Sequence, residues 1–263
     1  MGRIADAFTT LKRDRKKGFI PYITAGDPDL ATTEQLLVTL APYATLIELG
    51  VPFSDPMADG PVIQRASERA LKHNIGLREI LDTAARARQQ IDTPIILFSY
   101  YNPLLQFGLR RLAQAAKDAG VDGVLVTDLT PEESGEFESE LRARDLDMIF
   151  LIAPTSTDER LKLVAEHASG FIYAVSRAGV TGTRETVSVE AGKLVNRMRE
   201  FSSLPIAVGF GISNAAQVAD VNRYADAVVV GSAIVAEMER NIGTPNLARQ
   251  ISEFLTGLQD LHD

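Results

Sequence analysis

The chain has 263 residues and a formal net charge of −8, from 27 Lys and Arg against 35 Asp and Glu. This acidic balance argues against nucleic acid as the main partner, because binding to phosphate backbones depends on clustered Lys and Arg. The absence of cysteine excludes disulfides, thiolate metal sites and a cysteine nucleophile, and a count of three histidines argues against a multi-histidine metal centre.

The first residues do not have the pattern of a targeting segment. Met1–Phe8 holds no apolar core followed by a small-residue cleavage site, as a secretory signal would. Asp6 stands where a myristoylated chain would carry Ser or Thr, and no apolar run approaches the ~18 residues that span a membrane. We therefore expect a cytoplasmic protein with no membrane partner.

Eight short runs of β-branched or aromatic residues recur along the chain. Each run is almost continuously hydrophobic and precedes turn-forming residues, which is typical of strands buried on both faces of a parallel sheet. The runs are Ile20–Thr24, Leu46–Leu49, Ile95–Tyr100, Gly123–Val126, Met148–Ile152, Phe171–Val175, Ile206–Val208 and Ala227–Val230.

Segments with apolar residues three and four apart separate these runs. Leu109–Ala119 and Leu161–Ala168 are examples, and a glycine suited to a helix C-cap follows closely after each. Alternating strands and helices without a break in composition predict one (β/α)8 barrel, or TIM barrel, with 1–263 as a single domain. The alternative is an open doubly wound sheet, but Ala25–Pro28 does not supply the Gly-rich turn expected after its first strand.

Three segments fall outside the minimal repeat. Ile4–Leu11 is expected to form an extra N-terminal helix that plugs the amino end of the barrel. Pro61–Asn74 predicts an additional helix after the second strand, with proline in its first turn. The amphipathic tail from Leu247 to Leu258 predicts the closing helix.

The second strand carries a carboxylate among apolar residues. Glu48 must either pair with a cation or have its pKa raised by desolvation, which would suit it to proton transfer near neutral pH. A buried Glu satisfied by a neighbouring group is an equally open interpretation. Asp55 and Asp59 lie in the following loop, where a turn or helix cap is the simpler explanation and a place over the barrel mouth favours function.

Glycine-rich segments follow the last three strands. Ser176–Arg184 is suited to a mobile lid, and the preceding Tyr173 either packs in the barrel core or faces the site. Gly209–Asn214 and Gly231–Ile234 come after the seventh and eighth strands, where this fold usually binds phosphate through backbone N–H groups. A dinucleotide fingerprint fails because Asn214 occupies its last glycine position, and the chain has no P-loop motif.

The motifs together resemble those of the tryptophan synthase α subunit family. The resemblance rests on the long stretch from Glu48 to Pro61 with Gln64, on Phe19–Pro28, on Ser176–Gly182, and on Gly209–Ser213 with Gly231–Val235. These segments occur in family order over nearly the whole chain. The resemblance implies retro-aldol cleavage of indole-3-glycerol phosphate to indole and D-glyceraldehyde 3-phosphate.

The resemblance also implies roles for particular residues. Glu48 would be the general acid/base, Asp59 would bind the indole N–H, and Tyr173 would position substrate as the third catalytic residue. Thr181 in the lid would bond to Asp59 when the site closes. The implied indole pocket is Tyr22, Phe98, Tyr100, Leu125 and Phe210, and the implied phosphate site is Gly182, Gly211, Gly231 and Ser232. Tyr22 is a phenol where the family commonly has phenylalanine, so its hydroxyl needs a partner.

The family works with a second subunit. The resemblance implies an α2β2 heterotetramer in which indole passes to a β subunit that carries pyridoxal phosphate, with no cofactor and no metal in this chain. Three other functions stay open from the sequence: a stand-alone indole-releasing lyase, a catalytically silent regulatory subunit, and another sugar-phosphate enzyme such as an isomerase.

Overall fold

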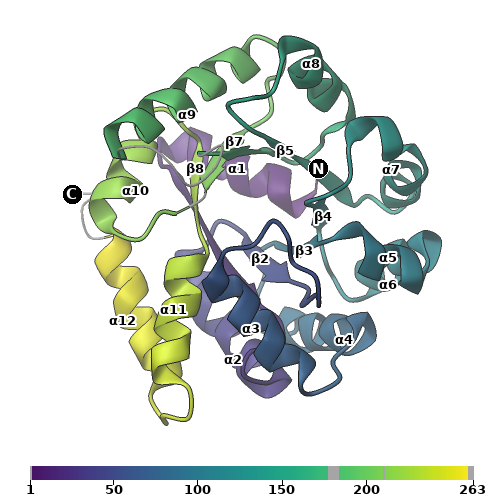
Figure 1. The fold of residues 1–263 in the computed structure, drawn as a ribbon, viewed down its shortest axis with the longest axis vertical. Helices are drawn as coiled ribbons and strands as arrows, with labels where there is room; N and C mark the ends of the chain where they lie inside the picture. The colour runs from purple at the N-terminus through teal and green to yellow at the C-terminus, as the bar shows by residue number, and fades with distance from the viewer. Residues whose placement is uncertain (1, 177–183, 210, 260–263) are drawn as a thin grey trace.

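The computed structural model describes residues 2–176, 184–209 and 211–259, except for the side chains of residues 184–188. Eight parallel strands close into a barrel in the order β1 to β8 (Figure 1). This closed order confirms the predicted (β/α)8 barrel and excludes the open sheet. The strands are β1 Gly18–Thr24, β2 Ile47–Gly50, β3 Ile95–Ser99, β4 Gly123–Val126, β5 Asp147–Ile152, β6 Ile172–Val175, β7 Ile206–Gly209 and β8 Ala227–Val230.

Helices surround the strands and cover their outer face (Figure 1). Leu36, Ile80 and Leu112 are fully buried against the outward-facing residues of the strands, so the largest apolar core lies between the two layers. The helices are α1 Arg3–Asp14, α2 Leu30–Leu40, α3 Pro61–Leu71, α4 Leu77–Arg88, α5 Tyr101–Phe107, α6 Leu109–Asp118, α7 Gly135–Arg142, α8 Asp158–His167, α9 Arg184–Arg199, α10 Ala215–Val221, α11 Ser232–Asn241 and α12 Leu247–Gln259, with short 3₁₀ turns at Ala41–Tyr43 and Pro131–Glu133.

A second, smaller core fills the inside of the barrel. It is formed by inward-facing residues of alternate positions, such as Leu46 on the approach to β2, Leu125 on β4 and Phe171 just before β6. The predicted N-terminal helix closes this core from below, since Ile4 and Phe8 of α1 are buried in it. The ring of Phe8 lies 5.9 Å from that of Phe171. The amino end of the barrel is therefore sealed.

Boundaries differ from the predicted ones mainly near the carboxyl ends of the strands. The third strand ends at Ser99, because Tyr100 is the N-cap of α5, a helix that the apolar pattern does not predict. The additional helix α3 begins at Pro61 as predicted and ends at Leu71, and His73 and Asn74 form a turn after it. Among the described helices none is both long and apolar enough to cross a membrane.

Candidate active site

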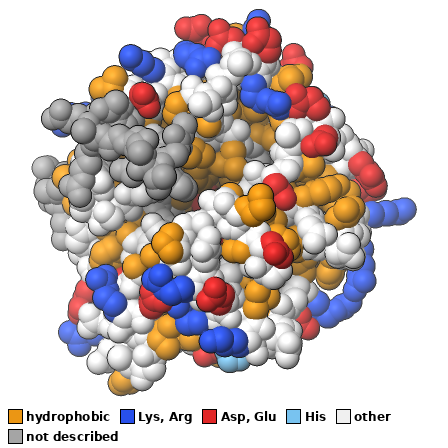
Figure 2. All heavy atoms as spheres, in the orientation of Figure 1, with side chains coloured by type: hydrophobic (Ala, Val, Ile, Leu, Met, Phe, Trp, Pro, Cys, Tyr) orange, Lys and Arg blue, Asp and Glu red, His pale blue; other side chains and the backbone are white. Residues whose placement is uncertain are grey.

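A cavity of about 500 Å³ opens at the carboxyl ends of the strands. The face seen in Figure 2 is hollowed near its centre, and hydrophobic side chains lie in the hollow. The lining combines apolar walls with a few polar groups, as small-molecule sites do. The described lining residues are Tyr22, Glu48, Ala58, Asp59, Gly60, Pro61, Val62, Ile63, Phe98, Thr127, Leu151, Tyr173, Val175, Gly211, Val229, Gly231 and Ser232.

Glu48 reaches the cavity from the inner face of β2. Its side chain alternates with the outward-facing Ile47 and Leu49, and its Cα is in register with Tyr22 on β1. Only 1% of Glu48 is exposed, and in the part of the chain that the structure describes neither a cation nor a hydrogen-bond donor reaches its Oε1 atom. The described residues therefore do not support the interpretation of Glu48 as a structural carboxylate that a neighbouring group satisfies.

Burial without a partner changes the acidity of this carboxyl. Desolvation raises the pKa of Glu48 well above its usual value, because removing water penalises the charged form. A raised pKa favours the protonated form of the carboxyl, which can donate its proton to a bound reactant and then accept another.

Asp59 faces the same cavity from the loop between β2 and α3. Desolvation raises the pKa of Asp59 to about 6, and a hydrogen bond from the Tyr100 hydroxyl limits the rise. Tyr100 Oη also accepts the backbone N–H of Ala58 at 2.8 Å, and Gln64 Nε2 donates to the Asp59 carbonyl at 2.9 Å. At neutral pH Asp59 is mostly ionised, so the cavity holds a charged carboxylate beside a carboxyl group whose pKa is raised.

The opposite wall is suited to an anion. Gly231 is the N-cap of α11 and has no side chain with which to cap it, and Ser232 is the first residue of the helix. Gly211 has a φ of 78°, a left-handed conformation that favours glycine. Free N–H groups at a helix start, together with the helix dipole, bind phosphate without Lys or Arg. No cationic side chain belongs to the described part of the lining, which makes this backbone site the natural place for a negative group.

The comparisons with known proteins agree on one family. The family model for the tryptophan synthase alpha chain matches residues 8–261. The tryptophan synthase alpha chain of Geobacter sulfurreducens is 49% identical over 261 residues, which cover 99% of this chain and 98% of that protein. The alpha chain of Burkholderia thailandensis is 50% identical over 98% of this chain and 96% of its own length. The chain belongs to the tryptophan synthase α family.

Solved structures of the family have the same fold. The tryptophan synthase α subunit of Legionella pneumophila superposes with a TM-score of 0.92 at 36% identity, covering 99% of this chain and 98% of that one. A chain of the tryptophan synthase α2β2 complex of Pyrococcus furiosus gives 0.86 at 40% identity, covering 92% and 98%. This chain is accordingly a lyase that cleaves indole-3-glycerol phosphate.

The implied indole pocket of a tryptophan synthase α chain is only partly present in the lining. Tyr22 and Phe98 lie there together, with ring centroids 5.3 Å apart and planes at 80°. The Tyr22 hydroxyl finds its partner in Thr24 Oγ1 at 3.3 Å. Leu125 lies in the barrel core and Tyr100 holds the Asp59 loop, so neither is among the lining residues. Phe210 lies outside the described residues, as do Thr181 and Gly182 of the predicted lid.

Tyr173 is brought beside Glu48 at the cavity floor. Burial and the nearby Glu48 carboxyl raise the pKa of the Tyr173 phenol well above its usual value, so it remains a hydrogen-bond donor. A Cβ added at Gly209 would lie 2.1 Å from Tyr173 Oη, which makes a glycine necessary there. Gly50 has the same relation to Tyr22 Oη, again at 2.1 Å. Both phenols therefore occupy space that a glycine on a neighbouring strand leaves open.

Sequence reasoning missed several apolar walls of the cavity. Leu151, Val175 and Val229 line it at the last inward position of their strands. Period-two alternation from Ile149, Tyr173 and Ala227 places these residues inward and would have found them. Thr127, just beyond β4, could have been found by the same rule.

Proposed function

We propose that, in the cleavage of indole-3-glycerol phosphate by this chain, Glu48 is the acid and base and Asp59 is the electrostatic partner of the indole ring. The observation that carries the proposal is the nearly complete burial of Glu48 beside an open cavity, with Oε1 unpartnered among the described residues. Burying such a carboxyl costs folding free energy, and groups that carry this cost beside a cavity are characteristic of active sites.

The reaction needs a proton donated and a proton removed at adjacent atoms. Neutral Glu48 protonates the indole ring carbon that carries the glycerol chain. The resulting carboxylate then takes the proton of the side-chain hydroxyl. Electrons of that O–H bond form the aldehyde C=O, and those of the breaking C–C bond return to the ring. Indole and glyceraldehyde 3-phosphate leave, and Glu48 is protonated again, which agrees with its raised pKa.

Asp59 stabilises the charge that appears between these steps. Protonation of the ring carbon places positive charge on the indole nitrogen, and an ionised carboxylate at the N–H lowers the energy of that state. A pKa of about 6 keeps Asp59 ionised at neutral pH. We further propose that Tyr173 orients the substrate at Glu48, and that Gly211, Gly231 and Ser232 bind the phosphate.

A β subunit is the proposed partner. The Pyrococcus furiosus relative is part of an α2β2 complex, and we propose the same assembly here, with pyridoxal phosphate in the β subunit and no cofactor in this chain. Met57, in the loop that carries Asp59, is 92% exposed, and a large apolar side chain in that position is suited to an interface. Passing indole between two biosynthetic subunits is consistent with a cytoplasmic location, which we also propose.

The experiment is incubation with indole-3-glycerol phosphate and detection of indole, with Glu48→Gln as the control protein. The proposal requires indole from the wild type and almost none from the variant. Wild-type turnover to an isomerised sugar phosphate without indole would instead identify a different sugar-phosphate enzyme. An unchanged rate in Glu48→Gln would remove Glu48 from the mechanism.

A further inference from the structure

Two helices that begin at the cavity run away from it side by side. α3 follows directly on the loop of Asp59, and α11 begins at Ser232, at the phosphate end. Figure 1 shows them adjacent, with α3 in dark blue and α11 in yellow-green, and they are in contact along their length. A small apolar cluster lies near their cavity ends: Tyr22, Ile63, Ala66 and Val235.

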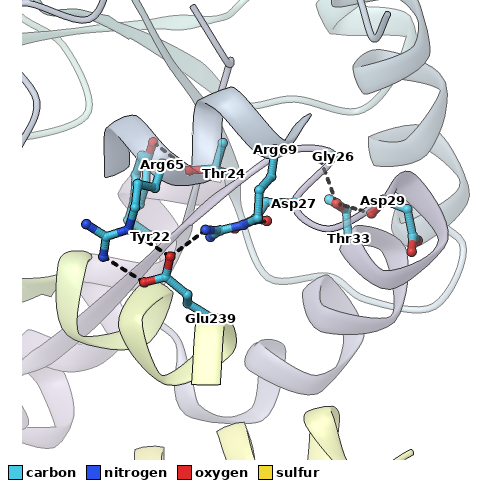
Figure 3. A network of polar contacts seen from close by, with 9 residues as sticks. All are labelled: Tyr22, Thr24, Gly26, Asp27, Asp29, Thr33, Arg65, Arg69 and Glu239. Atoms are coloured by element: carbon cyan, nitrogen blue, oxygen red, sulfur yellow. Dashed lines mark hydrogen bonds and ion pairs between the residues drawn. The ribbon is translucent and has the colours of Figure 1, made fainter. Parts of the chain in front are cut away.

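Ion pairs join the same helices further from the cavity (Figure 3). Arg65 on α3 donates from Nε and Nη2 to the two carboxylate oxygens of Glu239 on α11, at 2.8 and 2.7 Å. Arg69, one turn along α3, donates from Nη1 to Glu239 at 2.6 Å. We name these three residues, together with Asp27, which holds Arg69, the α3–α11 clamp.

The anchor of the clamp is Asp27, a buried carboxylate in the loop that follows β1. Arg69 donates from Nε and Nη2 to the two oxygens of Asp27, at 2.7 and 2.8 Å, and Asp27 is fully buried. The neighbouring loop is itself fixed, since Thr33 Oγ1 accepts from Gly26 N at 2.9 Å and donates to the Asp29 carbonyl at 2.9 Å. A planar guanidinium held by two oxygens on one side has a fixed orientation for its third contact.

Arg69 therefore connects both helices to the loop that follows β1. Its fork on Asp27 fixes the end of α3 relative to β1, and its remaining nitrogen fixes α11 relative to α3. Each helix carries one end of the cavity at its start, and a helix transmits a displacement along its axis as a rigid element. The clamp is thus placed to act on the distance between the loop of Asp59 and the amino end of α11.

We propose that Arg69 and Glu239 are positioning residues that match the spacing of the two cavity ends to a substrate with a ring at one end and a phosphate at the other. This inference rests on the proposed function, because only a ligand that spans both ends depends on their separation. Binding of such a ligand gains from pre-set geometry, whereas a ligand that occupies one end does not. Loosening the clamp should then weaken the spanning ligand selectively.

The test uses Glu239→Gln in the full chain, with Glu34→Gln as the matched control. Glu239 pairs with Arg65 at side-chain exposures of 27% and 49%, and Glu34 on α2 pairs with Arg86 on α4 at 26% and 49%. Each variant removes one carboxylate of similar exposure, but Glu34 lies between helices that do not border the cavity. Thermal unfolding of both proteins verifies that each is folded.

Binding is measured in a Glu48→Gln background, which prevents turnover, with three probes: indole-3-glycerol phosphate, indole and inorganic phosphate. We expect Glu239→Gln to weaken binding of the whole substrate about tenfold and to leave each single-end probe within about twofold. In the active protein KM should rise about tenfold with a smaller change in kcat. Glu34→Gln should leave all of these values within about twofold.

Two results would overturn the clamp. One is equal binding of the whole substrate by Glu239→Gln and Glu34→Gln. The other is a uniform weakening of all three probes in Glu239→Gln, which would mean general loosening instead of lost spacing. Indole release by the wild type separates this inference from the proposed function: its absence refutes the function, whereas its presence with an unaltered Glu239→Gln refutes the clamp alone.

Discussion

Two buried carboxylates, Asp122 at the amino end of the barrel and Glu48 at the carboxyl end, have opposite electrical settings. At the sealed amino end, Asp122 accepts hydrogen bonds from Arg3 at 2.8 Å, Arg88 at 3.0 Å and the Ile95 backbone N–H at 2.9 Å. At the open carboxyl end, Glu48 has no described cation near it. A buried charge with compensating partners remains ionised and depends on them, whereas an uncompensated carboxyl is driven towards its neutral form and becomes available for proton transfer.

The largest expected effect is on catalysis at the open end. Glu48→Gln keeps the shape of the side chain and removes its proton transfer, so we expect kcat to fall about 10³-fold or more. The wild-type carboxyl binds a proton more tightly when folded, so its contribution to stability is greatest at low pH and is lost as pH rises through its raised pKa. Glutamine removes this dependence, and the free energy of unfolding at neutral pH should be equal to or higher than that of the wild type. A large drop in the melting temperature would contradict the comparison.

The sealed end should respond in the opposite way. Asp122→Asn leaves Arg88, with 12% of its side chain exposed, without its compensating charge. We expect the free energy of unfolding to fall by about 3 kcal/mol, with kcat per folded molecule nearly unchanged. Urea denaturation combined with the indole assay measures both quantities. If Asp122→Asn lost catalysis without losing stability, Asp122 would act in the reaction, and the division between a structural amino end and a catalytic carboxyl end would be wrong.

Asp59 should add a pH dependence at the open end. Because desolvation raises its pKa to about 6, kcat/KM should fall as the pH is lowered through 6, where the carboxylate becomes protonated. Asp59→Asn should lower kcat/KM about 10²-fold and abolish this acid limb. Steady-state rates between pH 5 and 8 test this. If Asp59→Asn kept an acid limb at the same pH, the limb would belong to another titrating group.

The smallest expected effect concerns the residue that holds Asp59. The hydrogen bond from Tyr100 lowers the pKa of Asp59, so Tyr100→Phe should move the acid limb to higher pH. It also removes the acceptor of the Ala58 N–H. We expect about a fivefold loss of kcat/KM at pH 7. A limb that stays in place would show that this hydrogen bond does not act on Asp59 during catalysis.

Much of the fold follows from local pattern. Continuous apolar runs identified all eight strands, because strands buried on both faces leave that mark in the sequence. Helix α5 was not predicted, because its seven residues are too few to show a helical repeat, and the third strand was predicted one residue too long because Tyr100 is as apolar as the strand before it. Local signals also predict the two accessory helices. Phe8 marks the packing face of α1, and Pro61 marks the first turn of α3.

The site was predictable where a single residue breaks a local pattern. Glu48 stands out as a charge in an apolar strand, and Gly231 marks a helix start that follows a strand. The clamp was not predictable, because Asp27, Arg69 and Glu239 are remote in sequence and each alone resembles an ordinary surface charge. The tertiary role of Tyr100 was hidden for the same reason. What sequence cannot supply is the pairing of groups that only closure of the barrel brings together.

The protonation state of Glu48 is the most direct test of the account. Infrared difference spectra between the wild type and Glu48→Gln at pH 7 isolate the absorption of this one carboxyl group. We predict a protonated carboxylic acid band that is lost in the variant, because burial without a partner raises the pKa of Glu48. A carboxylate band in its place would show that Glu48 is charged at rest and would contradict the mechanism.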